Sequence, residues 1–235
     1  MKNLKRLLTL SLTLIMLLVV FALASCDMFI TVDDMFSTDL QAMMDDAMTG
    51  DNYTMLYEIE RGSKTTLKVD DGKMHISVRT DKTYDEYYLY RNEEQGAYYF
   101  AHDWKFDDKN KGFERTKLTN EQYVVKYIEL YSQYSHNQKL FNYRHILDMA
   151  KSVSEDEDHF KYYNEIYEKD EFLRREYEIK YADNALVISE KRTETVLNDK
   201  YTNETDKYTL LITNMKTTYS KVGSTEISFP AKVTN

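Results

Sequence analysis

Side chains that carry catalytic chemistry are few in this sequence, and their spacing matches no common type of active site. The chain has one cysteine, Cys26, and the G-x-S-x-G arrangement of a serine nucleophile is absent. The histidines lack the short spacings of metal ligands, so we expect each to be a surface or strand residue. They are His75, His102, His136, His145 and His159. The sequence therefore predicts a protein that is not an enzyme.

Three short segments partly match ligand-binding loops. Gly62-Ser63-Lys64-Thr65 is similar to the end of a phosphate loop, but the upstream glycine and the Gly-Lys pair are missing, which favours a hairpin turn. Residues 107–112 suggest a calcium loop, yet lysines stand where oxygen ligands are needed. The acidic run Glu155–Asp158 is most simply a solvated segment, with a cation site as the alternative. We predict no metal and no cofactor.

The position of Cys26 favours modification of its thiol. An apolar run, Leu7–Ala22, precedes it and follows three basic residues, which is the layout of a secretory signal. A transmembrane anchor is the alternative, but polar Asp27 follows at once and the run is short for the roughly 17–25 residues that span a bilayer. The segment Leu23-Ala24-Ser25-Cys26 resembles the lipobox of bacterial lipoproteins. That resemblance implies cleavage before Cys26, a diacylglyceryl group on its thiol, and an extracytoplasmic protein anchored to the cell membrane.

Composition bounds the class of the mature chain. Removal of residues 1–25 leaves 210 residues (235 − 25), enough for one domain with a sizeable core. The net charge falls from −9 to −12, because the removed segment carries three basic and no acidic residues. Such a charge argues against a nucleic-acid partner and against adhesion to anionic head groups, and we ascribe it to solubility. With 21 Tyr and one Pro, the chain favours antiparallel strands. We divide it into a signal (1–25), a tether (26–36) and a domain (37–235).

The first half predicts one helix and then a meander of strands. Thr38 and Gln41 fit a capping box, and an apolar face at helical spacing runs from Leu40 to Met48 before Gly50. From Tyr53 the apolar period changes to two, and Asp71-Gly72 is a strong hairpin dipeptide. The predicted strands are 53–59, 65–69, 73–79, 87–91 and 97–104.

The middle of the chain predicts two helices. Thr119 and Gln122 form a second capping box. The apolar stripe of the helix after it contains Tyr123, Val124, Tyr127, Ile128, Tyr131 and Tyr134.

A second helix is expected over 140–150, and strands over 172–181, 185–196, 208–214 and 217–222. Residues 160–167 suit either a strand or a helix. Pro230 should end the last strand or lie on an edge.

This order of elements resembles the lipoprotein-carrier architecture of LolA and of the LppX/LprG-type lipoproteins. The resemblance covers most of residues 38–230, but it lies in the pattern of elements; Asn52–Ile59, Asp71-Gly72 and Gly223–Pro230 are its local features. It implies an α+β fold, with a strongly curved antiparallel sheet forming an open half-barrel. A short N-terminal helix and a central helix pair would pack on the concave face, around a cavity for acyl chains. The family supplies no catalytic residues.

The chemistry that remains is binding of a lipid or another hydrophobic ligand. The alternative is a surface interaction module for a protein or glycan, in which the same side chains pack solidly and leave no cavity. The candidate lining is Met55, Tyr57, Ile59, Leu67, Val69, Met74, Ile76, Val78, Tyr127, Ile128 and Tyr131. The membrane, through Cys26, is the one partner that the sequence predicts.

Overall fold

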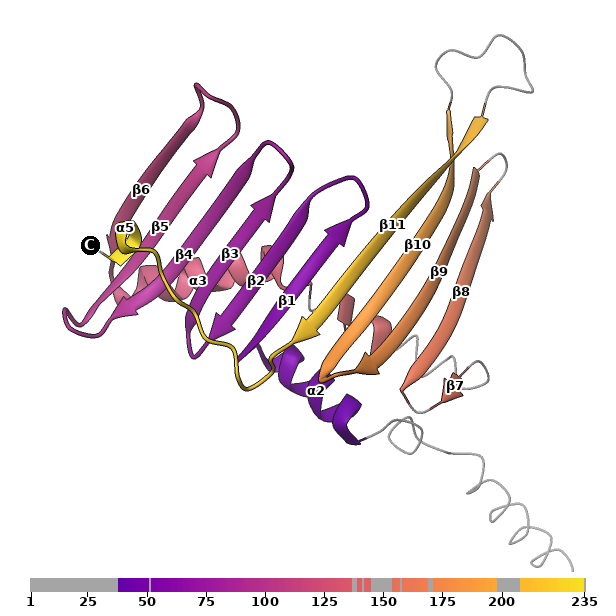
Figure 1. Ribbon diagram of the computed structural model, residues 1–235, viewed down its shortest axis with the longest axis horizontal. Coiled ribbons are helices and arrows are strands. Elements are labelled where there is room, and N and C mark those ends of the chain that lie inside the picture. Colours follow the sequence, from indigo (N-terminus) through magenta and orange to yellow (C-terminus); the bar gives the residue numbers. More distant parts are fainter. Residues whose placement is uncertain are drawn as a thin grey trace, which may run out of the picture.

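The protein is built on one open antiparallel sheet (Figure 1). The computed structural model describes residues 38–50, 52–136, 139–140, 142–144, 154–156, 158–168, 171–197 and 208–234. The strand order is β6-β5-β4-β3-β2-β1-β11-β10-β9-β8-β7. The strands are β1 (Asn52–Ile59), β2 (Lys64–Asp70), β3 (Lys73–Arg79), β4 (Tyr84–Asn92), β5 (Ala97–Lys105), β6 (Lys111–Leu118), β7 (Ser154–Asp156), β8 (His159–Glu168), β9 (Glu171–Ala182), β10 (Ala185–Leu197) and β11 (Tyr208–Ser220).

Tight turns with positive φ angles make each half of the sheet a meander. Asp71 and Gly72 have φ angles of 45° and 77°, and Asp183 and Asn184 have 54° and 56°. Two successive positive φ angles give the turn whose twist matches that of the flanking strands. The two meanders join at the centre, where β1 pairs with β11 and Met55 lies opposite Tyr219. The sheet is therefore continuous across two halves that are far apart in sequence.

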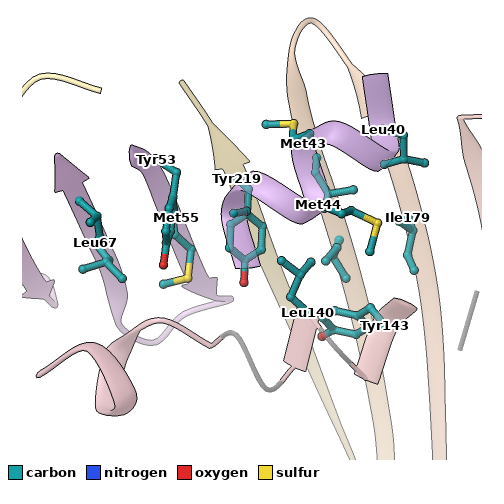
Figure 2. Close-up of a cluster of buried hydrophobic side chains, with 14 of the residues drawn as sticks. Leu40, Met43, Met44, Tyr53, Met55, Leu67, Leu140, Tyr143, Ile179 and Tyr219 are labelled. Carbon is teal, nitrogen blue, oxygen red and sulfur yellow. The ribbon is translucent and has the colours of Figure 1, made fainter. Parts of the chain in front are cut away.

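The inner face, defined here as the face carrying Tyr53, Met55 and Leu67, packs against helices. Helix α2 (Thr38–Thr49) packs at the lower ends of the central strands in the view of Figure 1, where it contacts β1 and β10. Helix α3 (Asn120–Tyr134) lies behind β1–β6 in the same view. Residues 139–140 and 142–144 are also helical. We call α2, α3 and these residues the helical cover. Figure 2 shows the core between the two layers, where side chains at alternate strand positions meet those of the cover, among them Leu40, Met43, Met44, Leu140, Tyr143, Ile179 and Tyr219.

The outer face is crossed by the C-terminal strap, which comprises residues 221–230 and the short helix α5 (Ala231–Thr234) (Figure 1). Near the start of the strap, the Oγ1 atoms of Thr225 and Thr54 share a hydrogen bond of 3.0 Å. Further along, the Phe229 ring lies 4.8 Å from that of Tyr90, whose hydroxyl donates to the carbonyl of Val233 at 2.5 Å. A second, smaller core therefore lies under the strap.

The predicted antiparallel sheet and the helix after Thr38 are confirmed, and residues 160–167 belong to a strand. Three details were wrong. The break expected near Asn214 is absent, because β11 is hydrogen bonded to β1 and β10 on both sides there. Strand β6 was not predicted. The segment before Pro230 is part of the strap and not a strand.

The helix prediction is met only in part. The capping box is confirmed, since Gln122 N donates to Thr119 Oγ1 at 3.2 Å and Thr119 N donates to Gln122 Oε1 at 2.9 Å. The stripe of α3 is narrower than predicted: its tyrosines face the sheet, whereas Val124 and Ile128 are 49% and 61% exposed. Most of the predicted helix 140–150 lies outside the described residues. No helix in the described ranges is long and apolar enough to cross a membrane.

Candidate ligand site between the sheet and its helical cover

Most of the predicted lining residues pack solidly. Five of them, in the half of the sheet under α3, have no exposed surface: Met55, Leu67, Val69, Met74 and Ile76. Val78, Tyr127 and Tyr131 are partly buried against the same core. Ile128 is exposed on the far side of α3, so it does not line the interior. Cys26 lies outside the described residues.

A hollow of about 600 Å³ lies in the other half of the sheet, and we call it the inner hollow. It is bounded by β8, β9, β10 and β11, by the end of β1, and by helical residues 139 and 142–143. Of the predicted lining, only Tyr57 contributes to it. The other walls were not predicted: Lys139, Asn142, Tyr143, Tyr162, Asn164, Arg175, Tyr177, Glu190, Arg192 and Met215.

Strand register orders these walls into rows across the sheet. One row is packed and apolar, with Ile188 beside Ile179 and that beside Phe160, all at most 2% exposed. The neighbouring row lies two residues away on each strand and on the same face. It carries Met215, Glu190, Tyr177 and Tyr162.

The row after that carries Arg192, Arg175 and Asn164. Since side chains alternate along a strand, the wall changes from apolar, through aromatic, to cationic on one face.

The aromatic walls of the inner hollow stay uncharged at neutral pH. Burial raises the pKa of Tyr57, Tyr143 and Tyr177, and the nearby Glu190 carboxylate raises each further. The Tyr143 hydroxyl donates to Glu190 Oε2 at 3.5 Å. His136, whose ring lies 4.6 Å from that of Tyr57, is also neutral, because burial lowers its pKa to about 4. The neutral tyrosines therefore offer ring faces to a ligand, while the Tyr143 hydroxyl is engaged by Glu190.

A larger hollow of about 820 Å³, the outer hollow, lies on the opposite face of the same strands. Its walls come from the strands and the residue after β1, so no second layer covers it. Its charged side chains are largely paired with one another: Glu178 with Lys180 at 2.9 Å, and Lys191 with Glu176 at 3.1 Å. Ile59, the remaining predicted lining residue, borders it. We favour the inner hollow, because it has walls from both layers.

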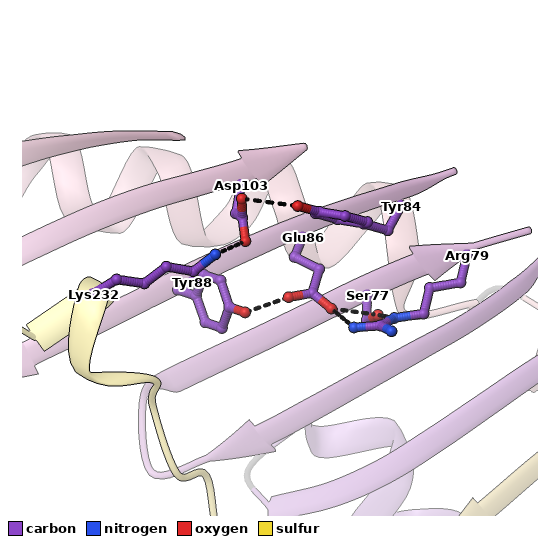
Figure 3. A network of polar contacts seen from close by, with 7 residues as sticks. All are labelled: Ser77, Arg79, Tyr84, Glu86, Tyr88, Asp103 and Lys232. Carbon is purple, nitrogen blue, oxygen red and sulfur yellow. Dashed lines mark hydrogen bonds and ion pairs between the residues drawn. The ribbon is translucent and has the colours of Figure 1, made fainter. Parts of the chain in front are cut away.

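A buried polar network under the C-terminal strap is the other cluster of titratable groups (Figure 3). Glu86 accepts hydrogen bonds from Ser77, at 3.2 Å, and from Tyr88, and it pairs with Arg79. Burial opposes its charge, but these bonds hold its pKa below the usual value. Asp103 pairs with Lys232 of α5. Each carboxylate thus has cationic or hydroxyl partners, which suits a structural clamp on the strap.

The histidines have structural surroundings. His102 Nε2 lies 2.5 Å from Asp85 Oδ1, and His159 Nε2 lies 2.9 Å from Glu178 Oε1. His75 stacks on Tyr88 at 4.6 Å, and burial lowers its pKa to about 4. His145 lies outside the described residues. In the described part of the chain, no group of His, Cys, Asp and Glu side chains has the geometry of a metal site.

Comparison with family models, with curated proteins and with solved structures finds no match to this chain. The likeness to lipoprotein carriers therefore rests on the order of elements, and the site rests on the geometry of the inner hollow.

Proposed function

We propose that this protein is a non-catalytic lipoprotein, anchored outside the cytoplasm through lipidated Cys26, that binds a lipid or another hydrophobic ligand. The inner hollow carries the proposal. It lies between the sheet and the helical cover, and its volume of about 600 Å³ falls in the range of roughly 300–1,000 Å³ typical of small-molecule sites. Rings of Tyr143 and Tyr177 and the flexible side chain of Met215 provide apolar surface, and six of the other walls are charged or amide side chains.

Native mass spectrometry of the full chain, expressed in a bacterial host and extracted in mild detergent, tests the proposal. We expect a non-covalent lipid adduct beyond the mass of the anchored protein. Met215→Trp places a larger side chain in the inner hollow and should abolish the adduct. Lys216→Trp, on the neighbouring position facing the outer hollow, is the matched control and should retain it. A clean protein mass from gently extracted material would contradict the proposal.

A surface interaction module is the second candidate, and one observation favours it. Val124, Val125 and Ile128 form an aliphatic patch on the solvent side of α3, and they are 49%, 65% and 61% exposed. Exposed aliphatic clusters of this kind mark contact surfaces. If this patch carries the function, Val125→Lys should abolish binding to a partner while any lipid adduct in the inner hollow persists.

A further inference from the structure

Two arginines face each other across neighbouring strands at the inner hollow. Arg192 of β10 and Arg175 of β9 are direct cross-strand partners, and both line the hollow. Side chains at such positions have Cβ atoms roughly 4.5–5.5 Å apart, and like charges there are unfavourable. Lys139, in the helical cover, contributes a third cation to the same walls.

The carboxylates among the described residues leave this charge only partly compensated. Arg192 pairs with Glu194, two positions further along β10, while its buried Nε donates to no described acceptor. Arg175 and Lys139 have no carboxylate partner in the described ranges. Lys139 Nζ lies over the ring of Tyr57, 4.8 Å from its centroid. Glu190 is the one acidic side chain among the walls.

The two faces of this half of the sheet therefore carry opposite charge. The inner hollow has three cationic side chains against one carboxylate, that of Glu190, whereas the outer hollow, with Glu190 left out, has four glutamates against three lysines. The whole chain has a net charge of −9. A cationic wall in an acidic protein favours anions at this place over the rest of the surface.

We propose that the inner hollow selects an anionic amphiphile, with its carboxylate or phosphate head at Arg175 and Arg192 and its apolar tail along Tyr177 and Met215. Arginine suits both heads, because its guanidinium donates two parallel hydrogen bonds to a carboxylate or a phosphate.

Glu190 sets the orientation of the ligand. Its row lies between the row of the two arginines and the packed apolar row. Its negative charge repels an anionic head from the row that it shares with Tyr177 and Met215, so the tail lies along that row. This inference rests on the proposed function and adds the chemistry of the head and the direction of the tail.

A competition experiment with three ligands of equal tail length tests the inference. The full chain in non-ionic detergent is incubated with equimolar palmitate, hexadecyl phosphate and hexadecanol, and bound ligand is read by native mass spectrometry. We expect the anions to be favoured over the alcohol by about tenfold or more, in line with the strength of charge-assisted hydrogen bonds. The ratio between palmitate and hexadecyl phosphate tells which head is preferred.

Neighbouring arginines provide the controls. Arg175→Gln combined with Arg192→Gln should abolish the preference for anions while hexadecanol still binds. Arg174→Gln removes the adjacent arginine, which pairs with Glu165 and Glu176, and should keep the preference. Arg175→Lys combined with Arg192→Lys keeps both positive charges and should retain most of the preference for anions. That result would also show that a chain changed at both positions still folds.

The outcomes separate the two proposals. Equal binding of palmitate and hexadecanol to the unaltered chain would overturn the head-group inference and leave the binding function standing. An equal loss of preference in Arg174→Gln would also overturn the inference, because it would point to overall charge. Failure of all three ligands to bind would overturn the proposed function itself.

Discussion

Replacement of Gly50 by alanine should destabilise the protein far more than the same change at Gly96. Both glycines have positive φ angles, 77° and 57°, which cost an L-residue about 1–2 kcal/mol. Their surroundings differ. A Cβ at Gly50 would lie 2.4 Å from the Tyr131 hydroxyl oxygen and 2.7 Å from its Cζ, whereas a Cβ at Gly96 meets nothing within 4 Å.

The difference in free energy of unfolding between the two variants measures how closely α3 packs beside the end of α2. Contacts between such atoms are normally about 3.5 Å or longer, so the Tyr131 ring must move by about 1 Å. Overpacking of this kind costs about 1–3 kcal/mol. The displaced hydroxyl also accepts a 3.4 Å hydrogen bond from Tyr53, a residue of the core. We expect Gly96→Ala to lower the free energy of unfolding by about 1 kcal/mol and Gly50→Ala to lower it by about 3 kcal/mol.

Urea unfolding followed by far-UV circular dichroism measures both losses. With a slope of about 2 kcal/mol per molar urea, the two midpoints should differ by about 1 M. Adding Tyr131→Ala to both backgrounds closes a double-mutant cycle, in which Gly50→Ala should then cost no more than Gly96→Ala. Equal losses at the two glycines in the presence of Tyr131 would refute the placement of α3.

Three further predictions concern the helix cap, the strap and pH. Thr119→Ala removes one side of the capping box of α3 and should cost about 1 kcal/mol in urea unfolding, with Thr119→Ser nearly neutral; a neutral alanine variant would contradict the cap. Lys232→Gln removes the partner of Asp103 and should speed hydrogen exchange in residues 231–234 while leaving β8–β11 unchanged, and uniform exchange would contradict a local clamp. His75 and His136 have pKa values lowered by burial from 6.5 to about 4, so the unfolded chain binds more protons between these values and stability should fall as pH is lowered from 7 towards 4.5. Replacing both histidines with Gln should flatten the slope of unfolding free energy in that window, and an unchanged slope would show that other groups cause it.

Local patterns predicted much of the first half of the fold. Strict alternation from Tyr53 and the Asp71-Gly72 turn placed the early strands, because their inner positions are apolar except for Thr65 and the turn requires positive φ angles. Likewise, Thr119 and Gln122 marked the start of α3 through reciprocal hydrogen bonds between neighbours in sequence. Such features depend on a few adjacent residues, which is why the sequence alone predicts them.

Features that depend on distant pairing escaped prediction. Strand β6 carries charged side chains on an edge and has no alternating apolar signal, with Phe113 40% exposed. The strap is held by contacts between residues more than 100 positions apart, such as Tyr90 with Val233.

The walls of the inner hollow were missed because they include inward-facing charges. One signal for them was present: Arg175 and Arg192 stand on the same strand faces as Ile179 and Ile188, where an apolar residue was expected.

Photo-crosslinking tests most directly whether the apolar tail of a ligand occupies the inner hollow. The full chain in detergent is irradiated with a palmitate analogue that carries a diazirine in its tail, and labelled peptides are identified by mass spectrometry. We expect labels on Tyr57 or Tyr143, which line the inner hollow but not the outer one, and we expect unlabelled palmitate to compete them away. Labels confined to the outer hollow at Tyr163, or to Val125 and Ile128 of α3, would contradict this placement of the tail.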